Sequence, residues 1–201
     1  MRVDFFFDCS SPWTYLAFDR IGPLCRELRA DLVYRPVLVG GVFNQVNRSV
    51  YESRQNPVPA KARYFRDDLQ LWADYQGLKI SWPEVFPVNS VKAMRGAFLA
   101  IERGCLEPYA RRVFELYWGQ ARDISQEDVL LEALTELPIQ ETEFLAWCGS
   151  DEARRQLRDN TQELIDRGGF GSPTMLLDGR TMLFGNDRME LLRALISGAP
   201  G

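Results

Sequence analysis

A serine followed directly by a proline, Ser11-Pro12, is the pair of residues whose types most clearly suggest chemistry. Serine is a preferred N-cap, and proline suits the first position of a helix because its missing N–H would have no partner there. The N–H groups at a helix N-terminus stabilise an anion, such as a thiolate, that lies against them. The Ser11 hydroxyl can donate one more hydrogen bond to that anion. A plain capping serine is the alternative interpretation.

The 201 residues include no histidine. This excludes Ser–His and Cys–His nucleophile pairs, histidine-containing metal sites and the usual general base near neutral pH. No metal site is expected, so the nucleophile must be activated by backbone dipoles, by a lysine or carboxylate, or be a thiol supplied from outside. The cysteines form no C-x-x-C pair and are predicted to be buried thiols in a reducing compartment. They are Cys9, Cys25, Cys105 and Cys148.

Composition and charge narrow the choice of partners. Hydrophobic residues make up 46% of the chain and the net charge is −4, which is ordinary for a globular protein. No run of Lys or Arg is long enough to follow a phosphate backbone, so we expect no nucleic-acid partner. The apolar triplet Phe5-Phe6-Phe7 is closed by Asp8 and predicts a strand, not an export signal. The stretch Val37–Phe43 is too short to span a bilayer, and a cytoplasmic protein without a membrane partner is expected.

The pattern around Ser11 predicts a strand, a helix and a second strand. Val3–Phe7 is rich in strand formers, and the turn that follows leads into a helix at Pro12. Gly22-Pro23 is predicted to kink this helix or to split it in two. Leu32–Leu38 indicates the second strand, with Gly40-Gly41 closing it.

The middle of the chain, from about Pro59 to Arg167, has an almost entirely helical pattern. Gly77 and Gly104 are expected to end two of its helices. Ser125-Gln126-Glu127-Asp128 resembles a capping box, and Ser150 is the predicted cap of the last helix. Apolar positions predict the inward faces: Phe65, Leu69, Trp72 and Tyr75 in one helix, then Val91, Met94, Phe98 and Ile101 in the next.

Strand character returns near the end. Thr174–Leu177 and Thr181–Phe184, joined by Asp178-Gly179, predict a hairpin. A closing helix is expected after Gly185-Asn186, with Met189, Leu192, Leu195 and Ile196 facing inward. The order predicts an α/β protein: a thioredoxin-like βαβ–ββα domain, residues 1–46 and 169–201, with an all-helical domain, residues 47–168, inserted in it.

Three segments carry a resemblance to a known family. Phe7–Leu16, Phe170–Thr174 and Phe184–Met189 resemble, in this order, the strand-to-helix turn, the cis-proline turn and the last helix entry of the 2-hydroxychromene-2-carboxylate isomerases and kappa-class glutathione transferases. These families form a branch of the DsbA-like thioredoxin superfamily. Pro57–Lys61, with Asn89–Arg95 after it, is a weaker fourth match.

The resemblance implies a glutathione site. Ser11 stands at the position of the catalytic serine that faces glutathione, and Thr14 replaces the second cysteine of a C-x-x-C motif, so this pair cannot exchange disulfides. Ser172 and the cis-proline Pro173 would meet the cysteinyl part of glutathione.

The same resemblance assigns the two ends of glutathione. The γ-glutamyl end would be held by Asn186 and Asp187. Phe184 and Gly185, which come just before them, belong to the same set of glutathione-binding candidates. The glycyl carboxylate would meet Lys61 and Asn47, with Asn56 as a rival to Asn47.

The function that the resemblance implies is a glutathione-dependent isomerase acting on a small unsaturated aromatic acid, in a protein expected to be a homodimer. A kappa-like glutathione transferase is the nearest alternative, and a non-catalytic thioredoxin-like glutathione-binding module is an alternative of another class. One departure concerns the substrate. The similar isomerases carry a basic residue just after the second strand, where this chain has the apolar run Gly40-Gly41-Val42-Phe43.

Overall fold

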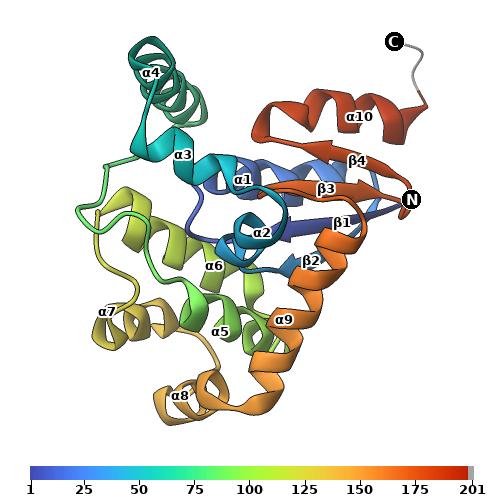
Figure 1. Cartoon of the computed structure of the whole chain (residues 1–201). Coiled ribbons are helices and arrows are strands. Elements are labelled where there is room, and N and C mark those ends of the chain that lie inside the picture. The colour runs from blue at the N-terminus through green and yellow to red at the C-terminus, as the bar shows by residue number, and fades with distance from the viewer. Residues whose placement is uncertain (199–201) are drawn as a thin grey trace.

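A mixed four-stranded sheet forms the centre of the computed structural model, which describes residues 1–198 (Figure 1). The strands lie in the order β2-β1-β3-β4; they are β1 (Arg2–Phe7), β2 (Asp31–Pro36), β3 (Thr174–Leu177) and β4 (Thr181–Phe184). Strand β1 is parallel to β2, and β3 is antiparallel to both β1 and β4. This is the thioredoxin-like α/β arrangement predicted from the sequence, with the βαβ and ββα halves joined through β1 and β3.

The alternation of side chains along β1 explains how the sheet is covered. Phe5 and Phe7 point to the face packed by α1 (Pro12–Glu27) and α10 (Met189–Ser197), where the main core lies. Phe6 points to the opposite face and packs with residues of α2 (Val39–Val46) and α9 (Asp151–Asp166). In Figure 1, α9 crosses in front of the sheet and α1 lies behind it. All three phenylalanines are buried, which fixes the end of β1 from which the Ser11 turn departs.

The long middle region is helical, as predicted. Figure 1 shows α5 to α8 gathered below the sheet, with α4 standing apart from them. Its elements are α3 (Ser49–Gln55), α4 (Pro59–Gln76), α5 (Val91–Glu102), α6 (Leu106–Phe114), the π-helix η1 (Glu115–Gly119), α7 (Glu127–Leu131), the 3-10 helix η2 (Glu132–Leu134) and α8 (Glu141–Gly149). A second 3-10 turn, η3 (Asn186–Arg188), leads into α10. The division into domains at residues 47 and 168 stays a prediction.

Two expectations near the first helix were wrong in their details. Helix α1 is not split at Gly22-Pro23 but runs from Pro12 to Glu27, because Ile21, Leu24 and Cys25 are buried and hold both halves against the core. The alternative outcome, a kink at this pair, stays a prediction. The Gly40-Gly41 pair does not close β2 but lies inside α2. A Cβ atom at Gly41 would lie 3.3 Å from the Thr161 methyl carbon, so the glycine allows α2 to approach α9 closely.

The cap and face predictions had mixed outcomes. Ser150 caps α9 through its Oγ, which accepts from the Ala153 N–H at 3.1 Å, and Gly77 ends α4 in the left-handed conformation. The Ser125 capping box does not form: α7 begins at Glu127 without a side-chain cap, because the Ser125 N–H donates to Asp123 Oδ1 instead. Four side chains expected to face inward are exposed: Phe65, Tyr75, Ile101 and Leu195.

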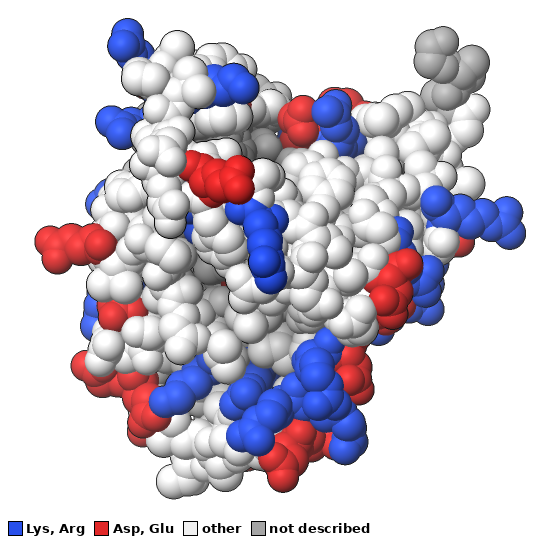
Figure 2. Space-filling model, in the orientation of Figure 1, with Lys and Arg blue, Asp and Glu red and all other residues white. Residues whose placement is uncertain are grey.

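The surface in Figure 2 carries charges of both signs, interspersed over most of the visible face, with a broad uncharged area across its middle. Basic side chains gather towards its lower part, but acidic ones lie among them. Within residues 1–198, no helix combines the length and the apolar composition that crossing a lipid bilayer requires.

Candidate glutathione site

The turn after β1 and the cis-proline turn before β3 meet at Ser11. Ser11 is extended at the N-cap of α1, and its Oγ accepts from the Thr14 N–H at 3.3 Å. The same hydroxyl donates to the Ser172 carbonyl oxygen at 3.1 Å. The Ser172–Pro173 peptide bond is cis, as the resemblance implied. Two turns that the family resemblance assigns to one site thus meet, although Ser11 and Ser172 lie 161 residues apart in the chain.

Ser172 and Thr14 extend this contact into a buried network. The Ser172 Oγ accepts from the Asp8 N–H at 3.1 Å and lies 2.8 Å from the Thr14 Oγ1. Thr14 occupies the place of a second cysteine, and here it is fully buried as a hydrogen-bonding partner of Ser172. The two turns are therefore joined by side-chain and backbone bonds together, which holds the Ser11 hydroxyl in place.

Asp8 is a residue of this site that the sequence analysis did not single out. Its carboxylate is completely buried, with Oδ1 accepting from the Ser10 N–H at 2.9 Å and Oδ2 from the Val39 N–H at 2.8 Å. Burial raises the pKa of Asp8 above its ordinary value, and the bonds from the Ser10 and Val39 N–H groups oppose the shift. An acid that closes an apolar strand and precedes a capped helix was the available signal. Asp8 ties the Ser11 turn to the start of α2.

The first turn of α1 leaves room for an anion. Pro12 has no N–H, and in the described part of the chain the Trp13 N–H has no acceptor. The unpaired Trp13 N–H, together with the helix dipole, favours a negative charge beside Ser11. No acidic residue lies in this first turn to take that role.

The entry to the last helix lies beside the cis-proline turn. The Gly185 N–H donates to the Pro173 carbonyl oxygen at 3.1 Å, and the Phe184 ring packs on Phe170 with 4.5 Å between centroids. Gly185 has a φ of 110°, and a Cβ atom there would lie 2.6 Å from Asp187 Oδ1. The missing side chain therefore lets the Asp187 carboxylate fold back towards the turn.

Asn186 and Asp187 differ in their surroundings. Asn186 is buried, and its Nδ2 has no hydrogen-bond acceptor within residues 1–198. The Asp187 side chain is about half exposed and lies 3.5 Å from Arg188 Nη1. A buried donor without a partner and an accessible carboxylate side by side suit a ligand that carries both a carboxylate and an ammonium group.

The two residues assigned to the glycyl end are placed differently. Asn47 is engaged within the chain: its Nδ2 donates to the Phe170 carbonyl oxygen at 3.0 Å and its Oδ1 accepts from the Ser49 Oγ at 2.9 Å. Lys61 is exposed in the first turn of α4. The structure joins Asn47 to the cis-proline turn and records no bond of Lys61 to the other candidate residues. The rival Asn56 ends α3, and its backbone N–H donates to the Glu52 carbonyl.

A cavity of about 680 Å³ opens beside the first turn of α1. Its walls come from α1, from α4 and from the chain after α4, and they are mostly apolar. The lining residues are Pro12, Trp13, Ala62, Phe65, Arg66, Leu69, Gln70, Ile80 and Trp82. Ala62 lines this cavity, and Lys61 is its neighbour in the sequence. A space of this size beside Ser11 suits an aromatic molecule.

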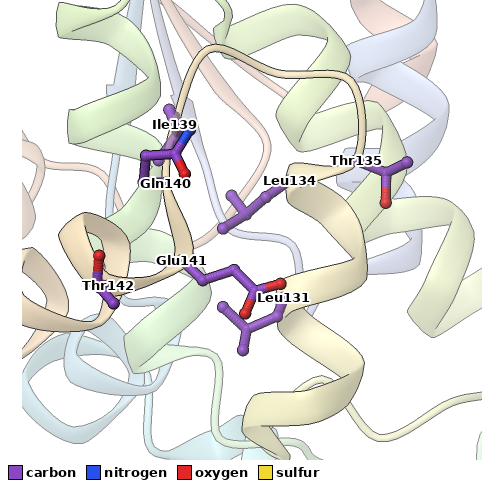
Figure 3. A pocket seen from close by; sticks show the side chains of 7 residues that line it. All are labelled: Leu131, Leu134, Thr135, Ile139, Gln140, Glu141 and Thr142. Atoms are coloured by element: carbon purple, nitrogen blue, oxygen red, sulfur yellow. The ribbon is translucent and has the colours of Figure 1, made fainter.

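A second cavity, of about 410 Å³, lies in the helical region between α7–η2 and the start of α8 (Figure 3). Leu131 and Leu134 line it on one side, and Ile139 and Glu141 on the other. Glu141 is its only charged lining residue, so the cavity lacks the paired groups that acid–base or nucleophilic catalysis needs. No cluster of three or more metal-ligating side chains occurs within residues 1–198.

The cysteines are buried and are not the reactive groups of this site. Burial, followed by the nearby Asp8 charge, raises the pKa of the Cys9 thiol well above its ordinary value. Burial also raises the pKa of Cys25 to about 11 and that of Cys148 to about 12. Because only a thiolate attacks well, these thiols stay unreactive near neutral pH.

Known proteins resemble this chain over its whole length. The family model of the DSBA-like thioredoxin domain matches residues 2–197. A 2-hydroxychromene-2-carboxylate isomerase from Pseudomonas sp. (strain C18) is 31% identical over 98% of this chain and 91% of its own. Glutathione S-transferase kappa 1 of Homo sapiens is 28% identical over 96% of this chain and 90% of its own.

A solved structure of a 2-hydroxychromene-2-carboxylate isomerase superposes with a TM-score of 0.82 at 26% identity, covering 98% of this chain and 95% of the isomerase chain. The same region, almost the entire chain, therefore matches in sequence and in fold. The chain belongs to the DSBA-like thioredoxin-domain family and, within it, to the branch of the 2-hydroxychromene-2-carboxylate isomerases and kappa-class glutathione transferases, which are enzymes.

Proposed function

We propose that the chain is a glutathione-dependent isomerase of the 2-hydroxychromene-2-carboxylate type. The observation that carries the proposal is the Ser11 hydroxyl at the N-cap of α1, hydrogen-bonded to Ser172 at the cis-proline turn and without a cysteine at positions 11 or 14. An arrangement that stabilises a thiolate but contains no accessible thiol of its own calls for a thiol from a ligand.

Ligand binding has a simple consequence for the Ser11 hydroxyl. A hydroxyl has one hydrogen to donate, and Ser11 gives it to the Ser172 carbonyl. When a peptide N–H of glutathione donates to this carbonyl, the Ser11 hydroxyl can turn to donate to the sulfur without leaving the carbonyl unpaired. The cysteinyl backbone would then lie along Ser172, with the thiolate at the first turn of α1 beside the Trp13 N–H.

The γ-glutamyl end of glutathione carries a carboxylate and an ammonium group. Asn186 offers its unpartnered amide to the carboxylate, and Asp187 offers a carboxylate to the ammonium group. Lys61 and Asn47 are proposed for the glycyl carboxylate. A cytoplasmic location, where glutathione is abundant, and a homodimeric state are part of the same proposal.

The reaction would be a reversible addition. The bound thiolate forms a C–S bond to a conjugated carbon of the substrate, and the electron pair of the double bond moves onto the rest of the conjugated system. Rotation about the resulting single bond follows, the C–S bond breaks, and the electron pair restores the double bond as the thiolate leaves. Atoms and charge balance without another reactant, and the cavity beside Pro12 offers space for the aromatic part.

Ultraviolet titration of bound glutathione near the thiolate absorption band tests the site. A pKa below the value of about 8.5 for a free thiol is expected for the complex. Turnover of 2-hydroxychromene-2-carboxylate with glutathione recovered unchanged supports the isomerase. A stable thioether product from an aromatic electrophile, without isomerisation, would identify a kappa-like transferase. Glutathione bound only as a thiol would point to a binding module.

A further inference from the structure

Arg54, near the end of α3, lies over two aromatic rings from separate parts of the chain. Its Cζ atom is 5.0 Å from the centroid of Phe86, in the segment between α4 and α5, and 5.7 Å from that of Phe43, in α2. Both distances are within the range of cation–π interactions. The guanidinium therefore bridges α2 and the segment that precedes α5.

Both rings lie beside the Ser11 site. The Phe43 ring approaches to 3.7 Å the position that a Cβ atom would take at Gly171, the residue before Ser172. On the other side, the Phe86 ring packs on Trp118, with 5.9 Å between centroids, and the Trp118 indole N–H donates to the Cys9 carbonyl at 3.0 Å. Arg54 is thus linked to the cis-proline turn through the Phe43 ring, and to the Ser11 turn through the Phe86 ring and Trp118.

The same aromatic group reaches the cavity beside α1. Trp82, which lines this cavity, packs on Phe86 with 4.9 Å between centroids. The Arg54 guanidinium is therefore one aromatic ring away from the wall of the cavity. A planar molecule that leaves the cavity towards Arg54 would pass along aromatic faces.

The charge of Arg54 has no partner in the chain. No ion pair or side-chain hydrogen bond within residues 1–198 includes it, whereas Arg48 nearby donates to the Asn44 carbonyl at 2.9 Å. Burial against the rings lowers the pKa of Arg54, and the groups that oppose this shift are the Tyr51 and Tyr117 hydroxyls, not a carboxylate. The Arg54 side chain is exposed, so an anion from solution can reach a guanidinium that lies over two rings and has no acidic neighbour.

We propose that Arg54 binds the carboxylate of the aromatic substrate and so selects an aromatic acid over its neutral analogues. Phe43 and Phe86 present apolar surface beside the guanidinium, which forms paired hydrogen bonds with a carboxylate. This inference rests on the proposed function and adds the residue that recognises the carboxylate of its substrate. Arg66, which lines the cavity from α4, is exposed like Arg54, but no aromatic ring lies under its guanidinium within residues 1–198.

Binding of trans-cinnamate and of its methyl ester, followed by quenching of tryptophan fluorescence, tests the assignment. The proteins are the wild type and Arg54→Gln, Arg48→Gln and Arg66→Gln, each with a melting curve and a glutathione titration by calorimetry. Arg54→Gln is expected to weaken cinnamate binding about ten- to a hundredfold and to leave binding of the ester and of glutathione unchanged. Arg48→Gln removes a positive charge from the same part of the chain, but Arg48 does not lie over the two rings. This control is expected to leave binding of cinnamate and of its ester unchanged.

Three results would overturn the proposal. If Arg54→Gln weakened binding of cinnamate and of its ester equally, Arg54 would have a packing role only. In that case a further variant, Arg54→Lys, which keeps the charge, would restore binding of neither compound. Weaker glutathione binding with unchanged cinnamate binding would assign the anion to the glycyl carboxylate. Loss of the acid preference in Arg66→Gln instead would move the site to α4. A wild type that binds no glutathione but keeps an Arg54-dependent preference for the acid would refute the proposed function and retain the anion site.

Discussion

The two sides of the candidate site are built in opposite ways. On the sheet side, Asp8 and Thr14 are fully buried and Ser172 is 7% exposed, and hydrogen bonds join all three to neighbouring backbone or side chains. On the other side stands an arm formed by α3 and α4, residues 49–76. Helix α3 buries no residue, and α4 buries only Leu69 and Ala73. The sheet side is thus fixed by packing, while the arm faces solvent.

This difference separates two tasks. A group that stabilises a thiolate must be held in position before the ligand arrives, and burial with satisfied hydrogen bonds provides that. Contacts to a variable substrate need only charge and apolar surface, which an exposed helix supplies without disturbing a core. Changes on the sheet side should therefore act on turnover, ligand retention or folding, and changes on the arm should act weakly or on substrate choice.

The largest effect is expected for Ser11→Ala. Loss of a hydroxyl that donates to a developing charge should lower turnover about ten- to a thousandfold, with glutathione affinity nearly intact. The lost N-cap should cost about 1 kcal/mol of stability. Steady-state kinetics and melting curves measure both. Ser150→Ala removes the same kind of cap from α9 and is the control: unchanged turnover in Ser11→Ala, or an equal loss in Ser150→Ala, would reduce Ser11 to a cap.

Asp187→Asn is expected to weaken glutathione binding about ten- to a hundredfold, because one charge-assisted bond to the ammonium group is lost. Its exposed side chain holds little of the structure, so the melting temperature without ligand should change little. Titration calorimetry gives the affinity. Glu190→Gln alters another acid at the start of α10 as the control. Equal affinities for wild type and Asp187→Asn would remove Asp187 from the site, and a collapsed melting temperature would make it structural.

Asp8→Asn is expected to act on folding. The amide replaces one acceptor oxygen by a donor that faces a backbone N–H, which should cost about 1–3 kcal/mol. Because the folded-state pKa of Asp8 is raised, the folded wild type binds its proton more tightly than the unfolded chain. Wild-type stability should therefore fall as the pH rises from 3.8 towards the raised pKa, and the deficit of Asp8→Asn should narrow.

Urea unfolding of both proteins at a pH of about 4 and of about 7 checks this sign, with the exposed Asp159→Asn as a control for the background. A deficit that grows as the pH rises would contradict the raised pKa of Asp8. Stability equal to wild type at both pH values would show that the buried carboxylate does not hold the Ser11 turn to the start of α2. The contrast between the two sides of the site would then fail.

Lys61→Gln should have the smallest effect. A single exposed charge on the arm is worth roughly 0.2–1 kcal/mol, so glutathione binding should weaken only about two- to fivefold. The same calorimetric titration measures it. A loss as large as that of Asp187→Asn would mean that α4 holds glutathione as firmly as the sheet side does, which would break the contrast.

Much of the sheet side could be read from the sequence, because its signals are local. The strand formers of Val3–Phe7, the Ser11-Pro12 helix start and the Asp178-Gly179 turn each satisfy a backbone requirement within a few residues. The contact between Ser11 and Ser172 is not local, and only the family resemblance brought the two turns together.

The arm and the start of α2 were read less well. Gly40-Gly41 favours a loop on its own, but the Asp8 carboxylate accepts from the Val39 N–H at the start of α2, and Thr161 lies close to Gly41. Arg54 gave no signal in the sequence, since its role depends on Phe43 and Phe86 lying on either side of it in space. Long-range placement, rather than residue type, decided these positions.

The burial of the cysteines has a consequence for how well this protein resists chemical inactivation. An enzyme that acts, as proposed, on electrophilic, unsaturated compounds would be exposed to alkylation at sulfur. The cysteine thiols within residues 1–198 are buried, and burial raises the pKa values of Cys9, Cys25 and Cys148. If the reacting sulfur belongs to bound glutathione, a side reaction alkylates the glutathione, and a new glutathione molecule replaces it at the next binding event. The group that side reactions modify then lies on a replaceable ligand, and the polypeptide itself stays unmodified.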